Sequence, residues 1–325
     1  VGSFKLVFGF ILFYLTLIGW FSNTWISMWV LMEVSFMVFM GLLSIDSSYA
    51  TSELSMKYFI VQVFAGLIVL ISILLSNFIS GLFTDVYMAL GLFVKLGLAP
   101  FHIWMLGLLG ESSWVGIFFM LGLMKLLPLT FVFYSLDIIW MGVFLGISVC
   151  VGSVFGIGNS SIQKLLGYSS MVGVCWMIYS AASGGSWCFF FFFFGYLFML
   201  FVFCMFMSQS GMYYLNQFGL MFSNLFSKIL FFFFSLVFSG MPPFLGFLLK
   251  WWVSWFLVFS GFSFTVVFLV LMSLFSLVFY VQLWFYFMLI YSFELKWYVC
   301  IFNSTFWFLI YFFCIFSMFI LLFLY

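Results

Sequence analysis

Long runs of apolar residues without a single charge recur along this 325-residue chain. A helix needs about 20 consecutive apolar residues to cross the hydrocarbon core of a bilayer, and the chain offers that length repeatedly. Charged residues make up 5% of the chain, whereas a soluble domain carries about 25%. In lipid every backbone N–H and C=O must be paired within the protein, so such runs fold as helices. The sequence therefore predicts an all-α polytopic membrane protein.

We expect about eleven transmembrane helices joined by short connections. The predicted helices span residues 4–21, 25–45, 57–76, 86–108, 113–134, 137–157, 168–183, 187–208, 226–250, 261–289 and 305–325. The helix at 168–183 is short for a span. The first apolar run lacks the arginine-rich, amphipathic pattern of an import presequence, so we expect it to be a span itself.

Prolines interrupt two of these helices at matching places. Pro242-Pro243 falls in an apolar run, 229–259, that is too long for one upright span and too short for two; Pro100 falls within 86–108. Proline removes a backbone N–H and clashes with the preceding turn, so both helices should be broken. If residues 1–134 and 135–290 are two halves, the broken helix is fourth of five in each. Five spans per half give opposite orientations, which indicates two inverted five-helix repeats.

Residues 291–325 would then add one C-terminal transmembrane helix to a single membrane domain. No repeated sequence stands out between the two halves. The loop lysines give the orientation. Lysines on the side of the N-terminus are Lys5, Lys57, Lys164, Lys228 and Lys296, and the opposite loops carry Asp85 and Asp137. The positive-inside rule places the N-terminus on the cytoplasm-like side and the C-terminus opposite.

Composition argues against several classes of site. The net charge of +1 offers no basis for binding nucleic acid. The single histidine, His102, cannot supply two haem ligands, and the six cysteines are scattered without a CxxC pair. No phosphate-binding loop or dinucleotide glycine pattern is present. We expect neither a cofactor nor a metal in this chain.

Four ionisable residues lie inside the predicted spans: Glu33, Lys95, Lys125 and Lys250. An ionisable group at bilayer depth costs roughly 2.5–3.5 kcal/mol on insertion scales, so such residues are functional candidates. Moving protons or ions is the function they favour most. The phenylalanine run at 189–194 is instead predicted to be packing or lipid-facing surface.

Prolines place free backbone acceptors beside two of the lysines. Pro100 frees the carbonyl of Leu96, next to Lys95, and Pro128 frees that of Met124, next to Lys125. Unpaired carbonyls within a membrane must be met by side chains or water, which indicates hydrated lysines. The alternative is that the prolines only kink the helices and the lysines snorkel to the interface.

Glu33 lies about eight residues into its helix, and Lys95 is its best partner by depth. The alternative is a neutral glutamic acid hydrogen-bonded to a neighbour. Three lysines against one glutamate leave positive groups in excess, so at least one amine is expected to be neutral and able to accept a proton. His102 follows Pro100 and is either a proton relay or gate, or a cap on the broken helix.

Three motifs resemble the subunit 2 family of mitochondrial NADH–ubiquinone oxidoreductase, or respiratory complex I. They are Val94-Lys-Leu-Gly-Leu-Ala-Pro-Phe-His-Ile-Trp104, Ile162-Gln-Lys-Leu-Leu-Gly-Tyr-Ser-Ser170 and Ser239-Gly-Met-Pro-Pro-Phe-Leu-Gly-Phe-Leu-Leu-Lys-Trp251. The order is that of the family, and the likeness covers essentially the whole chain. The abundant phenylalanine and the lack of arginine fit a divergent invertebrate mitochondrial gene.

The resemblance implies an antiporter-like fold in the proton-pumping arm of the complex. Carried over by motif, Glu33 and Lys95 would form a switching ion pair, Lys125 the central relay and Lys250 the terminal relay. It also implies the inner mitochondrial membrane, with the N-terminus in the matrix and the C-terminus in the intermembrane space. Partners would be neighbouring membrane-arm subunits and phospholipid rather than a stand-alone monomer.

One departure concerns the segment after Trp104, where the family usually has a Pro-Glu pair and this chain has Leu106-Gly107. Glu111 is the nearby residue that could substitute for that glutamate. Two other interpretations share the buried lysines. One is a stand-alone cation/proton antiporter or channel, and the other is a structural subunit whose charges only fix helix packing.

Overall fold

The computed structural model describes residues 2–45, 49–76, 78, 82–135, 138–217, 225–242 and 244–291. It is almost entirely helical, as the sequence predicts. The chain divides into two compact units, Val1–Ser148 and Val149–Tyr325. Within the described part, five helices are long and apolar enough to cross a membrane, and four shorter apolar helices accompany them. The predicted helix at 305–325 lies outside the described residues.

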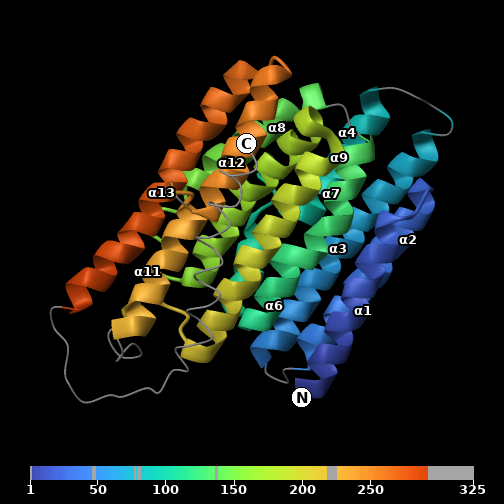
Figure 1. The fold of residues 1–325 in the computed structure, drawn as a ribbon. Helices are drawn as coiled ribbons and strands as arrows, with labels where there is room; N and C mark the ends of the chain where they lie inside the picture. The colour runs from blue at the N-terminus through green and yellow to red at the C-terminus, as the bar shows by residue number, and fades with distance from the viewer. Residues whose placement is uncertain are drawn as a thin grey trace. The chain divides into compact units, whose positions relative to one another are not determined.

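The first unit (Figure 1, blue to green) contains seven α-helices and the start of an eighth. They are α1 (Gly2–Trp20), α2 (Trp25–Ser44), α3 (Tyr49–Ser76), α4 (Leu82–Leu96), α5 (Ile103–Glu111), α6 (Trp114–Phe118), α7 (Met124–Ser135) and α8 (Ile138–Val154). A π-helical turn, η1 (Phe119–Leu123), joins α6 to α7. Neighbours in sequence pack in order, α1 on α2, α2 on α3 and α3 on α4, while α7 packs on α1, α2 and α4.

In the described part of the second unit lie the rest of α8 and four further α-helices. They are α9 (Ile162–Ser210), α11 (Leu225–Ser239), α12 (Leu245–Phe259) and α13 (Ser263–Tyr291), with the short 3-10 helix η2 (Leu215–Gln217). In this unit α12 packs on α9, and α11 packs on α13. Figure 1 draws these helices in green through yellow to orange-red.

Three predicted boundaries need correction. The helix predicted from residue 57 begins at Tyr49, because Glu53 and Lys57 form an exposed pair at 2.6 Å one turn apart and so stabilise a helix rather than end it. The helix predicted from residue 168 begins at Ile162, where Ser161 has extended dihedral angles. Lys164 therefore lies in the first turn of α9. The broken helix predicted to end near Lys250 continues to Phe259.

A glycine separates two predicted helices that α9 contains. Gly185 has φ 66° and ψ −161°, far from helical values, and divides the run into two arms. The break was expected between residues 183 and 187, so the two predicted helices are present. A left-handed φ is accessible to glycine at little steric cost, and a side chain here would be strained.

Both helices predicted to break do so, but each stops at a glycine before its proline. The amide of Gly97 (φ 69°) donates to Val94 O and that of Leu98 to Phe93 O. The amide of Gly240 (φ 77°) donates to Val237 O and that of Met241 to Leu236 O. This pair of bonds is the Schellman helix ending, which needs a left-handed residue just past the helix.

The two endings share a short sequence pattern, which is a repeat that was not predicted from the sequence. The shared pattern is a glycine, then a proline three residues later, then a phenylalanine. It occurs in Gly97-Leu-Ala-Pro-Phe101 and in Gly240-Met-Pro-Pro-Phe244. Each glycine ends one helix, and the proline prevents that helix from restarting at once. Each unit thus contains one helix pair, α4–α5 or α11–α12, built on the same stop.

We predict that Gly97→Ala destabilises the assembled protein, whereas Gly107→Ala does not. Alanine at position 97 would have to adopt the left-handed backbone conformation of Gly97, and its Cβ would lie 2.9 Å from the Met105 sulfur. A Cβ at Gly107 would meet nothing within 4 Å. A left-handed non-glycine residue costs roughly 1–2 kcal/mol, and alanine inside a helix gains about 0.5–1 kcal/mol over glycine. Heat-induced aggregation of purified membrane protein would measure both. Equal midpoints for the two variants would contradict this account of the helix stop.

Candidate functional site

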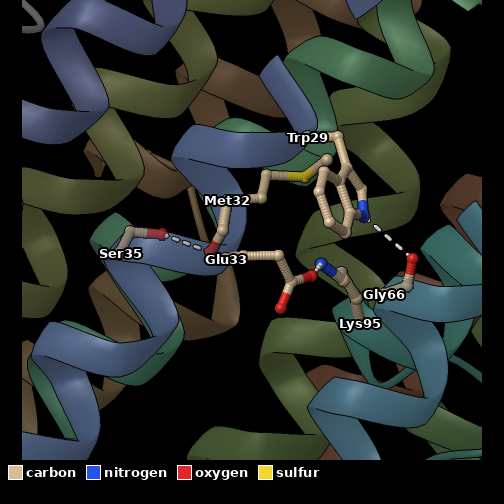
Figure 2. Close-up of polar contacts among 6 residues, drawn as sticks. All are labelled: Trp29, Met32, Glu33, Ser35, Gly66 and Lys95. Atoms are coloured by element: carbon tan, nitrogen blue, oxygen red, sulfur yellow. Dashed lines mark hydrogen bonds and ion pairs between the residues drawn. The ribbon is translucent and has the colours of Figure 1, made fainter. Parts of the chain in front are cut away.

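The first unit holds an ion pair between Glu33 of α2 and Lys95 of α4. The Lys95 Nζ donates to Glu33 Oε1 at 2.6 Å, and the two side chains are 4% and 20% exposed. Figure 2 shows the amine pointing directly at the carboxylate. The two residues that sequence reasoning paired by depth are therefore in contact in the structure.

Local structure sets the position of Lys95. It lies in the last turn of α4, two residues before the glycine stop. The C-terminal end of a helix carries a partial negative charge, which stabilises a cation there by about 0.3–1 kcal/mol and more when partly buried. Two groups therefore stabilise a positive charge on Lys95, namely the C-terminal end of α4 and the carboxylate of Glu33.

Gly66 of α3 makes room for the glutamate. A Cβ at Gly66 would collide with Glu33 Oε1 and lie 2.9 Å from the carboxyl carbon. The same glycine accepts a hydrogen bond from Trp29 Nε1 through its carbonyl at 2.8 Å, as Figure 2 shows. Trp29 and Glu33 are one turn apart on α2 and both lie against α3 at this point. Sequence reasoning did not identify Gly66, one of 27 glycines.

A small cavity adjoins the pair on the side of α7. Its volume is about 20 Å³, and its polar lining comes from Lys95, Lys125, Ser35, Tyr58, Gln62 and Trp104. A cavity needs roughly 10–15 Å³ to hold one water. The indole N–H of Trp104 is buried without a hydrogen-bond partner among the described residues. A water with several polar neighbours would fit there, since buried donors are normally paired.

Lys125 reaches this cavity from the first turn of α7 and is 4% exposed. The π-helical turn η1 precedes it directly, and Pro128 follows it within the same helix. A π turn shifts the register of the following residues and is often found at functional sites. Lys95 and Lys125 therefore line one cavity although they come from different helices.

His102 lies elsewhere. It stands just before α5, its Nδ1 is 3.2 Å from the Pro100 carbonyl oxygen, and it does not line the cavity. The helix start receives no hydrogen bond from its side chain. Glu111 is exposed at the end of α5, four residues after the exposed Gly107. The role of His102 stays a prediction.

In the second unit Lys250 of α12 reaches back to the end of α11. Its Nζ donates to the carbonyl of Ser239, the last residue of α11, at 3.2 Å. A Cβ on Gly240 would be 2.7 Å from this nitrogen, so the glycine both ends the helix and admits the amine. Gly246 has a matching role, because a Cβ there would collide with the Val237 carbonyl oxygen. Lys250 also lines a cavity of about 40 Å³.

No group of three or more His, Cys, Asp and Glu that could hold a metal occurs in the part of the chain that the structure describes. The four described cysteines, Cys150, Cys175, Cys188 and Cys204, are free thiols. Asp46, Asp137, Glu294 and Lys296 lie outside the described residues.

Comparison with known proteins identifies the family. The family model described as "NADH:quinone oxidoreductase/Mrp antiporter, TM" matches residues 22–279, most of the chain. NADH-ubiquinone oxidoreductase chain 2 of Anopheles gambiae is 30% identical over 286 residues, covering 85% of this chain and 84% of the relative. This chain belongs to the chain 2 family of NADH-ubiquinone oxidoreductases. The resemblance predicted from the three motifs is confirmed.

Further relatives are consistent with that membership. The chain 2 protein of Locusta migratoria is 26% identical over 290 residues, covering 86% of this chain and 84% of the relative. Among solved structures, a chain of respiratory complex I from Thermus thermophilus with bound aureothin matches with a TM-score of 0.74 and 20% identity. It covers 82% of this chain, which spans 66% of that longer chain. At this identity the match establishes the antiporter-like fold alone.

A chain of the Mrp complex from Dietzia sp. DQ12-45-1b gives a TM-score of 0.70 at 17% identity, over 80% of this chain and 56% of that chain. The antiporter-like fold predicted from the sequence is therefore supported by two separate solved complexes. The division into halves at 1–134 and 135–290, and their inverted relationship, stay predictions.

We predict that Lys95→Met destabilises the protein more than the double variant Lys95→Met/Glu33→Gln. Removing one partner of a buried pair costs about 3–5 kcal/mol, because it leaves a buried charge unpaired. The cost here should lie near the lower end, since Glu33 is 20% exposed on its side chain. The amount of chain retained in purified membranes, with its heat-aggregation midpoint, would test this. A double variant less stable than the single one would be inconsistent with a charged pair.

We also predict that Gly66→Ala lowers the heat-aggregation midpoint of the purified protein and that Glu33→Asp in the same chain restores part of it. The alanine methyl would displace the carboxylate from Lys95, and the shorter aspartate would leave space for it. Gly116→Ala is the matched control, because its Cβ would meet only ordinary contacts at 3.5 Å or more. No recovery with Glu33→Asp would show that Gly66 acts only through helix packing.

Proposed function

We propose that this chain is a proton-translocating membrane-arm subunit of respiratory complex I. Its family membership supports the assignment to that complex. The observation that carries the mechanism is the Glu33–Lys95 pair beside a cavity that Lys125 also lines. Electron transfer from NADH to ubiquinone would take place in partner chains, because this chain offers no ligand set for a redox centre in its sequence.

In this proposal the ion pair is the element that responds to electron transfer. While Glu33 and Lys95 are in contact, the ammonium is held by its counter-charge. A movement that separates them leaves the ammonium without that partner, and it can give its proton to water in the cavity. The water passes a proton to a neutral Lys125 amine, so one proton moves and Lys95 becomes neutral. Lys250 acts as the terminal relay in the second unit.

We also propose where the chain lies in the cell and which partners surround it. The chain would lie in the inner mitochondrial membrane with its N-terminus in the matrix, in agreement with the lysines near the ends of the spans. Of these, Lys5, Lys164 and Lys228 lie in the first turns of helices rather than in loops. Neighbouring membrane-arm subunits and phospholipid would cover the large apolar side chains that α1 and α13 expose, such as Phe10 and Phe264.

The runner-up function is a stand-alone cation/proton antiporter. The observation that supports it is the matching family model, whose description also names the Mrp antiporter. The two functions differ in assembly, since a stand-alone transporter would be active when purified by itself. Chain 2 relatives matching 85% and 86% of this chain favour the subunit. Co-migration of the chain with a very large complex on a native gel would decide between them.

We predict that Lys125→Ala lowers proton pumping coupled to NADH oxidation by roughly tenfold or more, since a positioned proton carrier contributes about 10²–10⁴. The control is Lys57→Ala, which removes an exposed lysine paired with Glu53 on the surface. Pumping by the purified complex in lipid vesicles, normalised to assembled complex, would be measured. Unchanged pumping in Lys125→Ala would refute the relay. Lost assembly with normal pumping in the remaining complex would indicate a structural role.

A further inference from the structure

The cavity beside Lys250 is lined by hydroxyl groups from separate helices. Besides the lysine, its polar lining consists of Ser169, Tyr196 and Ser276. Ser169 and Tyr196 come from the two arms of α9, and Ser276 comes from α13. At about 40 Å³ the cavity exceeds the roughly 10–15 Å³ that one water needs. Lys250 therefore shares this cavity with neutral hydroxyl groups that can both donate and accept a proton.

Further hydroxyls extend this group away from the lysine. Tyr196 interacts with Ser170, which is completely buried, and Tyr280 has Ser169 as a polar neighbour. Tyr280 lies one turn after Ser276 on α13 and is 3% exposed. Its hydroxyl is buried without a hydrogen-bond partner of good geometry among the described residues. A buried hydroxyl of this kind is unfavourable unless water or a mobile neighbour satisfies it.

A wider cavity of about 400 Å³ lies near this group, although none of the five hydroxyls lines it. It is lined by Phe279, the residue before Tyr280, by Leu283, one turn after Tyr280, and by Leu165, one turn before Ser169. Its polar lining consists of the amides Asn159, Asn216 and Gln282 and the hydroxyl of Ser160. Ser160 and Asn216 are exposed, so this cavity reaches the surface of the described part.

We propose that the hydroxyls of Tyr196 and Tyr280, together with Ser169, Ser170 and Ser276, relay protons between Lys250 and the wider cavity. The proposal rests on the proton-translocating function above and adds residues to it. Each oxygen accepts one proton through a lone pair and releases its own to the next oxygen, so no phenolate forms. One proton leaves the Lys250 ammonium, which becomes a neutral amine, and one proton arrives at water in the wider cavity.

The serines in this group can serve such a relay without breaking the helix. The hydroxyl of Ser169 donates to Leu166 O at 3.0 Å, that of Ser170 to Gly167 O at 2.7 Å and that of Ser276 to Ser273 O at 2.7 Å. Each oxygen keeps two lone pairs for an incoming proton, and rotation about the C–O bond redirects its own. The tyrosine side chains are longer, so their hydroxyl groups can reach from one helix to the next.

The experiment uses the intact complex in lipid vesicles with the variants Tyr280→Phe and Tyr196→Phe. Each removes one oxygen and keeps the ring. We expect proton pumping per assembled complex to fall about threefold or more, less than the roughly 10²–10⁴ of a positioned acid or base, because water can partly replace the oxygen. Assembly and heat stability should be unchanged, because each variant keeps the buried ring and removes only one oxygen. Tyr179→Phe is the matched control, since Tyr179 is also buried on α9 but lines neither cavity.

The outcomes separate this proposal from the broader function. Normal pumping in both tyrosine variants, with pumping lost in Lys125→Ala and Lys250→Ala, would overturn the hydroxyl relay and leave the proposed function intact. Normal pumping in the lysine variants as well would overturn both. A loss of assembled complex in the tyrosine variants, with normal pumping by what remains, would count against the relay because the oxygens would then be structural.

Discussion

Each compact unit places a lysine ammonium at the C-terminal end of a helix that stops at a glycine. Lys95 sits in the last turn of α4, and Lys250 donates to the last carbonyl of α11. The end of a helix leaves carbonyl groups without a helical partner, and inside an apolar protein these must be satisfied. A buried ammonium likewise needs acceptors. In the second unit one contact satisfies both groups, because the Lys250 amine donates to the Ser239 carbonyl. In the first unit the Lys95 amine donates to the Glu33 carboxylate instead.

The two lysines differ in what else they contact, and in the proposed function this difference would divide their roles. Lys95 has a true counter-charge in Glu33, so a movement of α2 against α4 changes the charge balance of the site. Separating such a pair costs several kcal/mol, enough to couple helix motion to proton release. Lys250 is held by a neutral carbonyl and borders a cavity of hydroxyls. It is suited to passing a proton on rather than to sensing a movement.

Sequence reasoning found the buried charges and the broken helices because both are local signals. A lysine in an apolar run and a proline in a helix are recognised without knowing the fold. It placed the breaks at Pro100 and Pro242, whereas the helices end at Gly97 and Gly240. The chain has 27 glycines, so these two could not be recognised as helix ends from their residue type alone. The matching segments 97–101 and 240–244 would have identified the two glycines as helix ends. That match is visible only when the two halves of the sequence are compared with each other.

Gly66 and the hydroxyl cluster were missed for a different reason, since their roles exist only between helices. Nothing in the segment around Gly66 indicates that a carboxylate from α2 lies against it. Tyr196 follows a run of phenylalanines and Tyr280 lies in an apolar helix, so periodicity assigns both to packing.

A chain with 5% charged residues gains from building polar paths out of hydroxyls. Each buried charge costs roughly 2.5–3.5 kcal/mol on insertion scales. A buried serine costs far less when its hydroxyl donates to the backbone carbonyl three residues earlier in the same helix. Ser72, Ser148 and Ser180 make this hydrogen bond as well. Charges are then needed only where a proton must be held or its movement controlled. In the proposed relay, lysine and glutamate would occupy the few control points, and hydroxyls and water would fill the distance between them.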